Sequence, residues 1–419
     1  MLNIYKVIPV LTIIYLIIVP IYSLNIICPI TKVSIINTKT EKFIVILDKN
    51  AANNHFNMLN TCFEKNIINF DPSGDSQKIS NEDVLVFSFD KFIAYFGDFN
   101  PYFAMNVLSK IKGVQLVEKS KKASLDGRKT TSRKTTSRSK TTLYNLDRID
   151  TAKMRYDGFY TYPTSAGEGV NVYILDTGVR MTHDEFKDRI KLGGVFCDEC
   201  EDGDDVYGHG THVAGTIAGT TYGVAKLANI INVRVGDDNG IFDLIAITKG
   251  VNYVINAHQH DENKNSVINM SFHLEYSEAM IKLVEECTNN GIHVAVSAGN
   301  SYIDACSVTP AAASSVITVA ASDRSDIMAN FSNYGSCVNI SAPGVDILSS
   351  FIESDTDSEY LDGTSMSSPH VAGTIALYIS TFGNLPPSDM SNAITSLATK
   401  NIINEIPDNN DIYLLRVPQ

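Results

Sequence analysis

Four polar residues have types and local contexts that suit catalysis. Asp176 follows the apolar run of VYILDTGV, His209 lies between two glycines in GHGTHVAGTIAG, Asn300 ends HVAVSAGN, and Ser365 lies in DGTSMSSPHVAG. A serine hydroxyl becomes a nucleophile when an imidazole accepts its proton, and a carboxylate holds that imidazole in the required tautomer. A side-chain amide can stabilise the oxyanion that forms on the attacked carbonyl. The four residues therefore suit acyl-transfer chemistry if the fold brings them together.

Each of these residues also has an ordinary structural explanation when it is considered alone. Asp176 and Asn300 could be turn residues, and Thr364 or Ser365 could cap the helix that is predicted to start there. The esterase pattern G-x-S-x-G is not met, because residue 367 is a serine. A helix N-terminus nevertheless favours negative charge, so a hydroxyl at this place has a ready oxyanion environment.

A second histidine, His212, raises the question of a zinc site shared with His209. The spacing H-x-x-H differs from the H-x-x-x-H spacing that places two ligands on one helical face, and no acidic residue lies between the two histidines. We therefore predict no metal site and expect His212 to be a buried, hydrogen-bonded histidine.

The elements that must position these residues alternate along residues 142–419. Apolar runs typical of buried strands alternate with helical patterns, which predicts an α/β fold with a parallel central sheet and helices on both faces. In such a sheet, functional residues gather at the carboxyl ends of the strands, where Asp176 and Asn300 fall. The predicted strands are 170–175, 230–235, 267–270, 293–297, 316–320 and 338–341, and the predicted helices are 209–218, 244–257, 277–290, 365–380 and 390–399.

A smaller unit precedes this region. Its predicted order is strand 43–47, helix 55–64, strands 84–89 and 92–96, helix 102–110 and strand 114–117, which is the α+β ferredoxin-like arrangement. Before it, residues 1–23 contain Lys6 and then an apolar run over 7–22. The run is short for a membrane span and predicts a signal peptide ending near Ser23, with an uncleaved anchor as the alternative.

The two units are joined by a basic segment, residues 119–141. Residues 119–140 hold nine Lys/Arg and one acid, Asp126, and KTTSR occurs at 129–133 and again at 134–138. No apolar periodicity is present, so we predict a disordered, protease-accessible linker. A nucleic-acid or heparin patch is the alternative, but it lacks interleaved aromatic residues.

Charge also divides the chain. Residues 1–141 contain 19 Lys/Arg and 11 Asp/Glu, net +8, and residues 142–419 contain 15 and 36, net −21, which together give −13. This asymmetry indicates two functional parts.

The segments that hold the four polar residues resemble the subtilases, in particular their proteinase K-like branch. The resemblance covers about 142–382, and residues 42–118 also resemble the family's inhibitory, chaperone-like propeptide. It implies a secreted serine endopeptidase that acts through an acyl-enzyme and is made as a self-processed zymogen. The matching segments are Asp-Thr-Gly (176–178), Gly-His-Gly-Thr-His-Val-Ala-Gly (208–215), Ser-Ala-Gly-Asn (297–300), Phe-Ser-Asn-Tyr-Gly-Ser (331–336), Ala-Pro-Gly (342–344) and Gly-Thr-Ser-Met-Ser-Ser-Pro-His-Val-Ala-Gly (363–373).

The resemblance implies a role for each residue of the site. Ser365 is the nucleophile, His209 is the general base and then the acid, and Asp176 fixes the tautomer of the imidazole. The amide of Asn300 and the backbone N–H of Ser365 hold the oxyanion. The propeptide docks its strand 114–117 into the cleft, and self-cleavage falls between 118 and 142. The implied substrate-binding residues are Phe242, Ser271, His273, Ala298 and Gly299.

The chain departs from the family pattern beside the expected cleft. His273 and Leu274 stand where relatives usually have two glycines, and Phe242 stands where glycine is frequent. These side chains add bulk along the path of the substrate backbone, so we predict an altered specificity or a narrower cleft. The same bulk supports the alternative of a weakly catalytic subtilase-fold binding or coat protein.

Calcium binding is a family habit that the sequence leaves open. Asn339 stands where proteinase K relatives have an aspartate, and an amide binds calcium more weakly than a carboxylate does. We therefore predict no required cofactor.

The seven cysteines are an odd number, which in a secretory chain indicates disulfides and at least one thiol. The resemblance implies a disulfide between Cys306 and Cys337. Cys197 and Cys200 form either a local disulfide or free thiols, and Cys287 is expected to be a buried free thiol.

An acidic loop, residues 198–205, has six acids in eight positions. Either it attracts basic substrates or the chain's own basic linker, or it is a solvated surface loop. The expected partners are protein or peptide substrates and the chain's own propeptide as an intramolecular inhibitor, with no nucleic acid and a monomeric state. The expected location is the secretory pathway, with the cell exterior, a vacuole or a cell coat as destinations.

Overall fold

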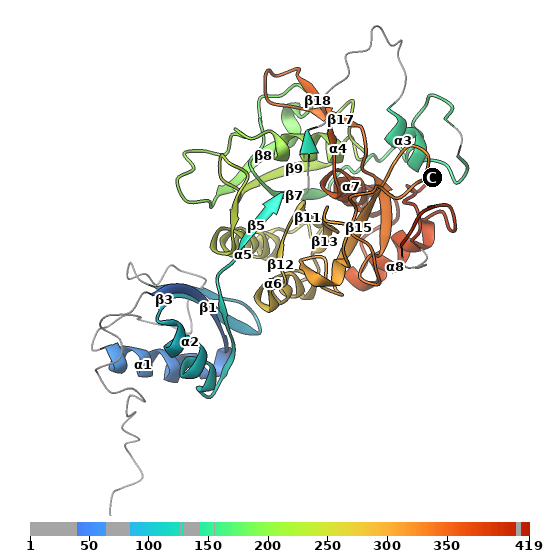
Figure 1. Ribbon diagram of the computed structural model, residues 1–419. Helices are drawn as coiled ribbons and strands as arrows, with labels where there is room; N and C mark the ends of the chain where they lie inside the picture. The colour runs from blue at the N-terminus through green and yellow to red at the C-terminus, as the bar shows by residue number, and fades with distance from the viewer. Residues whose placement is uncertain (1–39, 64–83, 126–127, 130–142, 155, 408–411) are drawn as a thin grey trace, which may run out of the picture.

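The computed structural model describes residues 40–63, 84–125, 128–129, 143–154, 156–407 and 412–419 (Figure 1). The predicted signal peptide and most of the KTTSR repeat lie outside these residues. Within the described part of the chain, no helix combines the length and apolar character needed to cross a membrane. We refer to residues 40–119 as the N-terminal unit and to residues 143–419 as the C-terminal unit.

The C-terminal unit is built on a seven-stranded sheet in which all neighbouring strands are parallel. The strand order is β16-β15-β13-β11-β7-β9-β8. Six strands follow the predicted apolar runs closely. The seventh, β8, was not predicted because its sequence IKLGGV contains two glycines and its residues are only partly buried. The strands are β7 (Asn171–Asp176), β8 (Ile190–Val195), β9 (Asn229–Arg234), β11 (Ser266–Met270), β13 (His293–Ser297), β15 (Ile317–Ser322) and β16 (Ile340–Pro343).

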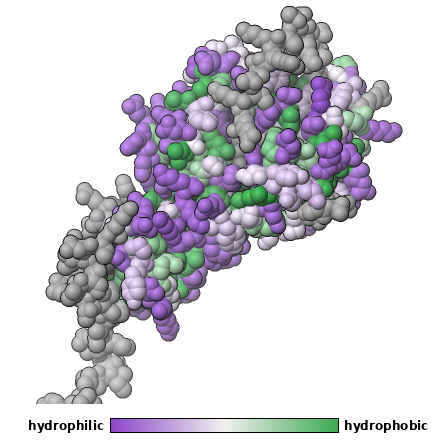
Figure 2. All heavy atoms as spheres, in the orientation of Figure 1, coloured by the Kyte–Doolittle hydropathy of each residue, from purple (hydrophilic) through white to green (hydrophobic). Residues whose placement is uncertain are grey.

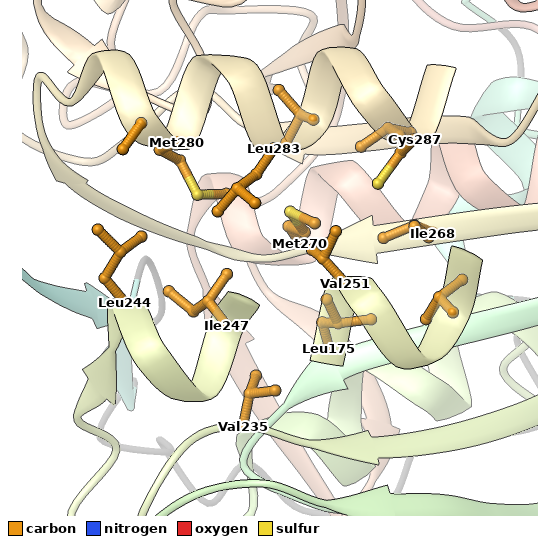
Figure 3. Close-up of a cluster of buried hydrophobic side chains, with 14 of the residues drawn as sticks. Leu175, Val235, Leu244, Ile247, Val251, Ile268, Met270, Met280, Leu283 and Cys287 are labelled. Carbon is orange, nitrogen blue, oxygen red and sulfur yellow. The ribbon is translucent and has the colours of Figure 1, made fainter. Parts of the chain in front are cut away.

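Helices cover both faces of this sheet, as the sequence predicted. Side chains alternate along each strand, so Tyr173 and Leu175 of β7 enter one apolar cluster, and Val172 and Ile174 enter the other. The first cluster lies under α5 (Leu244–His260) and α6 (Glu278–Asn289), whose apolar side chains point toward the strands in Figure 3. The second lies under α4 (His209–Ala218), α7 (Thr364–Phe382) and α8 (Pro387–Leu397); the short α3 (Tyr144–Ile149) opens the unit.

The N-terminal unit has the predicted ferredoxin-like order. Its antiparallel sheet runs β2-β3-β1-β4, and its two helices pack on one face of this sheet through a separate apolar cluster. The other face of the sheet, including Ile44, Ile46 and Phe96, belongs to the same cluster as α5 and α6. The elements are β1 (Glu41–Asp48), α1 (Ala52–Phe63), β2 (Val84–Ser88), β3 (Phe92–Phe99), α2 (Pro101–Asn106) and β4 (Val114–Lys119).

Two carboxylates add polar contacts between the units at α6. The backbone N–H of Asp90 donates to Glu286 Oε1 at 2.9 Å, and the backbone N–H of Ala279 donates to Glu118 Oε2 at 3.3 Å. Ala279 lies in the first turn of α6, where a carboxylate also interacts favourably with the helix dipole. The N-terminal unit is therefore packed against the C-terminal unit beside α6, as Figure 1 shows.

The chain after β4 is not disordered throughout, so the prediction for 119–141 was wrong where the structure describes it. β5 (Lys122–Leu125) lies between β10 (Phe242–Asp243) and β12 (Phe272–Glu275) and is antiparallel to both. β6 (Arg128–Lys129) pairs with β18 (Ser358–Asp362), which also pairs with β17 (Ile347–Ser350).

The partner strands of β5 and β6 supply the backbone hydrogen bonds, and they lie more than a hundred residues away in the sequence. Local periodicity therefore gave no sign of them.

Strand 114–117 was expected to enter the cleft, but it belongs to β4 and pairs with β1 instead. A short β14 (Val308–Thr309) completes the sheet on the far side of β12. On the face shown in Figure 2, polar residues cover much of the C-terminal unit and apolar residues appear in separate patches.

Candidate active site

Asp176 and His209 meet at the carboxyl end of β7. The Nδ1 atom of His209 donates a hydrogen bond to Asp176 Oδ1 over 2.7 Å, and the residues are 3 % and 0 % exposed. The backbone N–H of Thr177 donates to the same carboxylate oxygen at 2.8 Å. Because Nδ1 is the donor toward the carboxylate, Nε2 is the ring nitrogen that can accept a proton.

The glycines around His209 allow this approach. A Cβ on Gly210 would lie 2.1 Å from the carbonyl oxygen of Gly178 and 3.1 Å from Asp176 Cβ. Gly208, which precedes α4, has φ +99°, a conformation that favours glycine. The pattern Gly-His-Gly is thus explained by the close packing of α4 on the end of β7.

Asp205 holds the same junction together, and the sequence analysis did not single it out. Its carboxylate is buried and accepts hydrogen bonds from the hydroxyl of Thr177, the hydroxyl and N–H of Thr211, and the N–H groups of Tyr207 and Gly208. Thr177 in turn accepts from the N–H of Gly210 at 3.0 Å. Burial raises the pKa of Asp205, and these donors act in the opposite direction.

Ser365 lies in the first turn of α7 and is fully buried. Its hydroxyl donates to the carbonyl oxygen of Ser271 at 2.8 Å, and the Ser271 hydroxyl donates to the carbonyl oxygen of Ser365 at 3.0 Å. Asn269 Nδ2 donates to the Ser271 hydroxyl, and Ser368 donates to Asn269 Oδ1, each at 2.8 Å. Ser271 was expected to bind substrate, and the structure gives it a contact that positions the start of α7.

Asn300 lies beside the same helix start. Its Oδ1 atom accepts hydrogen bonds from the N–H of Thr364 at 3.0 Å and from the Thr364 hydroxyl at 2.8 Å. The Thr364 hydroxyl also accepts from the N–H of Gly299 at 3.1 Å. Thr364 therefore fixes the orientation of the Asn300 amide next to Ser365. The sequence analysis had considered it only as a helix cap.

The residues expected to line the cleft fall into two groups. Phe242 and His273 lie in the two strands that flank β5, opposite Ala123 and Ser124. Ala298 is buried in a small apolar cluster with Ala305 and Val308 and has no exposed side chain, and Gly299 contacts Thr364 as described above.

Leu274 was expected to narrow the cleft, and this expectation was wrong. The side chain is 2 % exposed and belongs to the core beneath α5 and α6. Side chains alternate along β12, so a residue next to one that faces the cleft points to the other side of the strand.

The second histidine, His212, is buried as predicted. Its Nε2 atom donates to the carbonyl oxygens of Ile347 and Glu359, and burial lowers the pKa of His212 to about 3. The Oδ1 atom of Asn339 accepts from the N–H of Thr318 at 2.7 Å, so the residue is already used within the protein. Within the described ranges, no group of three or more His, Cys, Asp or Glu residues is arranged to hold a metal ion.

The cysteines and the acidic loop also have defined surroundings. Disulfides join Cys306 to Cys337 and Cys197 to Cys200, and Cys287 is a buried free thiol whose pKa is raised by burial. In the acidic loop, Asp198 lies 3.6 Å from the ammonium of Lys249, and Asp202 lies 3.9 Å from the guanidinium of Arg234. Cations of the C-terminal unit itself thus face part of the loop, and its attraction for basic substrates stays a prediction.

One signal in the sequence could have revealed Asp205. An aspartate commonly accepts hydrogen bonds from the backbone N–H groups two and three residues later, and Asp205 has this relation to Tyr207 and Gly208. Because Asp205 ends a run of acids, the segment around it has the composition of an exposed loop. The burial of one acid among six was not readable from the sequence.

Known proteins share this architecture and these segments. The model of the Subtilase family (Peptidase_S8) matches residues 167–412. The subtilase-type proteinase isp6 of Schizosaccharomyces pombe, named for the sexual differentiation process, is 37% identical over 343 residues, which cover 81% of this chain and 71% of that protein.

A second relative is the extracellular serine proteinase of Thermus sp. (strain Rt41A). It is 42% identical over 260 residues, and the match covers 62% of each chain. Among solved structures, a cold adapted subtilisin-like serine proteinase matches with a TM-score of 0.63 and 37% identity, covering 67% of this chain and 100% of that one. The chain therefore belongs to the subtilase family of subtilisin-like serine proteinases.

Proposed function

We propose that the protein is an endopeptidase that cleaves peptide bonds through an acyl-enzyme on Ser365, with His209 and Asp176 completing a catalytic triad. The observation that supports this proposal best is the buried hydrogen bond from His209 to Asp176, which leaves Nε2 of the imidazole as the proton acceptor. The family supports the reaction class, and the position of Ser365 in the first turn of α7 supports its role as the nucleophile.

In the first step, the Ser365 Oγ atom attacks the carbonyl carbon of the scissile bond while its proton passes to His209 Nε2. The negative charge that develops on the carbonyl oxygen is stabilised by the backbone N–H of Ser365 and by the Asn300 amide, which Thr364 orients. Asp176 stabilises the imidazolium and keeps the ring in place.

The tetrahedral intermediate then collapses. His209 gives the proton to the leaving amine, the C–N bond breaks, and the acyl group stays on Ser365 as an ester. Water repeats the sequence with His209 as the base, which releases the second product and restores the serine. No step needs a metal ion.

The chain organisation fits a zymogen. We assign residues 1–23 to a signal peptide, 24–118 to an inhibitory propeptide, 119–141 to the connecting segment and 142–419 to the catalytic domain. The packing of the N-terminal unit on α6 and the insertion of β5 beside the site support this assignment. A relative is extracellular, which supports a secretory route for this chain, with the cell exterior, a vacuole or a cell coat as its destination.

The alternative of a weakly catalytic binding or coat protein rested on bulk in the cleft. β5 pairs with both flanking strands beside Phe242 and His273, and Leu274 points into the core, so these side chains leave room for an extended peptide. The packing therefore favours a cleft that accepts substrates.

The test compares the full chain with Ser365→Ala and with a matched control, Ser367→Ala. Ser367 lies two residues further along α7, and its hydroxyl donates to the carbonyl oxygen of Ala342. We expect the wild type and Ser367→Ala to process themselves into two fragments and to hydrolyse a denatured protein substrate. We expect Ser365→Ala to stay full-length and inactive. Equal processing by Ser365→Ala and the wild type would rule out the proposal.

A further inference from the structure

A disulfide lies at the start of the acidic loop, close to the segment that carries Asp176. Cys197 follows the end of β8, and its partner Cys200 begins the run that leads to Asp205. The Sγ atom of Cys200 lies 3.8 Å from the carbonyl oxygen of Gly236, and the N–H of Gly236 donates to the carbonyl oxygen of Asp176 at 3.0 Å. The disulfide therefore contacts a residue that is hydrogen-bonded to the aspartate of the proposed triad.

The other end of the loop is fixed to the same segment. Asp205 accepts a hydrogen bond from the hydroxyl of Thr177, which is the residue after Asp176, and two more from Thr211 in the first turn of α4. Four residues separate Cys200 from Asp205. A change at the disulfide thus has a short path to the contact between β7 and α4.

Two side chains of β9 hold the loop between these ends. The guanidinium of Arg234, a residue that is 1 % exposed, donates to the carbonyl oxygens of Asp202 at 3.0 Å and Asp204 at 2.7 Å. The amide of Asn232 donates to the carbonyl oxygen of Gly203 at 2.6 Å. Because these hydrogen bonds do not involve the disulfide, the loop stays attached to the sheet when the disulfide opens. We therefore expect an enzyme with this disulfide reduced to stay folded.

The turn within the disulfide has a backbone conformation that the cross-link helps to hold. Glu199 has φ +67°, in the left-handed region that residues with a Cβ rarely adopt. Such a conformation persists where the surrounding structure fixes it, and here the chain on both sides of Glu199 is joined by the disulfide. Opening the disulfide lets this residue return to an ordinary conformation, which moves Cys200 away from Gly236.

The disulfide is also open to a small reductant. Cys197 and Cys200 are partly exposed, and the two residues between them are exposed. This cross-link joins residues three positions apart, whereas the disulfide of Cys306 and Cys337 joins residues 31 positions apart. In the chain-entropy account, the stability that a disulfide adds grows with the length of the loop it closes. Reduction of the shorter cross-link is therefore expected to lower activity more than global stability.

We propose that the disulfide of Cys197 and Cys200 is a redox-sensitive element that holds the segment of Asp176, so that its reduction lowers kcat and its reoxidation restores kcat. A dithiol is the reductant: one of its sulfurs attacks a cysteine sulfur and the S–S bond breaks, and its second sulfur then displaces that cysteine. The products are two cysteine thiols, which take up the two protons of the dithiol, and the oxidised cyclic disulfide. This inference rests on the proposed function and adds a regulation of the same site.

The first test uses the mature wild-type enzyme and dithiothreitol, so it needs no variant. Alkylation and peptide mass mapping give the fraction of reduced Cys197 and Cys200, and peptide hydrolysis gives kcat and KM on the same samples. A misplacement of about 1 Å costs roughly 10² in rate, and the contacts from β9 limit the movement, so we expect kcat to fall roughly tenfold. We expect KM to change little and kcat to recover when oxidised dithiothreitol is added.

Two double variants assign the effect to one disulfide. Cys197→Ser/Cys200→Ser is expected to have the kcat of the reduced wild type and no response to dithiothreitol. The matched control, Cys306→Ser/Cys337→Ser, removes the longer cross-link. It is expected to keep the response of kcat to dithiothreitol, and its melting temperature is expected to fall further than that of the first variant.

Three results would overturn this inference: an unchanged kcat with Cys197 and Cys200 fully reduced, a pair that dithiothreitol leaves intact, or an equal response in Cys197→Ser/Cys200→Ser. The proposed function stands in each case if the oxidised enzyme hydrolyses peptides and Ser365→Ala does not. If hydrolysis by the oxidised enzyme does not depend on Ser365, the proposed function itself fails.

Discussion

At the level of single residues, Asp205 joins the two segments that carry Asp176 and His209. This carboxylate joins the turn after β7 to the first turn of α4 through Thr177 and Thr211, and it is 4 % exposed. Replacing a buried acceptor that has several donors lowers the free energy of unfolding, because each donor that loses its partner stays buried without a hydrogen bond. Asp205 thus acts as a positioning residue, because it contacts neither the imidazole nor the hydroxyl.

The variant Asp205→Asn tests this positioning role. An amide has only one acceptor oxygen, so some of the present donors lose their partner. We expect the free energy of unfolding to fall by about 2 kcal/mol or more, with a loss of kcat, measured by chemical denaturation and peptide hydrolysis. The neighbouring exposed residue offers a matched control, Asp204→Asn, which is expected to change little. Equal effects of the two variants would contradict the role of Asp205.

In the proposed mechanism, Asn300 acts on the transition state. Its Oδ1 atom is engaged by Thr364, and its amide nitrogen is assigned to the developing oxyanion. We expect Asn300→Ala to lower kcat by roughly 10²–10³, a magnitude established on subtilisin, while KM changes little. Steady-state kinetics on a peptide substrate give both values. A large rise in KM with an unchanged kcat would argue for ground-state binding instead.

At the level of elements, α6 carries much of the packing between the N-terminal unit and the C-terminal unit. Its N-terminus receives Glu118, its last turns present Glu286 to the turn at Asp90, and its apolar face shares a cluster with β1 and β3. The face of the N-terminal sheet opposite its helices packs into this cluster. The two units therefore stabilise each other.

Replacing Glu286 tests this interface. Glu286→Ala removes the acceptor for the N–H of Asp90 and leaves that group without its charged partner. Hydrogen bonds to charged groups contribute about 1.5–3 kcal/mol, so we expect inhibition by an added N-terminal unit to weaken roughly tenfold to hundredfold. The inhibition constant is measured with the mature enzyme and a peptide substrate. Glu285→Ala, one residue earlier, is the control, and an equal effect there would count against the contact.

The sequence predicted those elements that carry their own pattern. The buried parallel strands were readable because their apolar runs are continuous, and α4 to α8 were readable from helical periodicity. Strands β5, β6, β10, β12 and β18 were not, since they are short and exist through pairing with distant segments. For the same reason, the motifs offered Asp176, His209 and Ser365 as candidates but gave no sign of β5, which pairs with β10 and β12.

At the level of the whole molecule, buried histidines link stability to pH. Burial lowers the pKa of His212 to about 3 and the pKa of His370 and of His55 to about 4. These values lie below the value of 6.5 for the unfolded chain, so unfolding takes up protons in acid. Above about pH 6.5 these histidines are neutral in both states and do not lower the free energy of unfolding. As the pH falls from there toward the folded pKa values, the free energy of unfolding decreases.

We therefore expect the melting temperature to fall on acidification from pH 6.5 to pH 5. In this range each buried histidine lowers the free energy of unfolding by up to about 1.4 kcal/mol for each pH unit. Calorimetry on the Ser365→Ala protein makes the measurement without self-digestion. A melting temperature that stays constant or rises over this range would contradict the neutral state of these histidines.

The central claim is that Ser365 is the nucleophile, and a fluorophosphonate probe tests it most directly. The probe reacts with an activated serine, and peptide mass mapping locates the adduct on the mature enzyme. We predict a single adduct on Ser365, absent from Ser365→Ala and strongly slowed in His209→Ala, because the imidazole must accept the hydroxyl proton. An unlabelled wild-type enzyme, or an adduct that forms equally well in Ser365→Ala, would contradict the account.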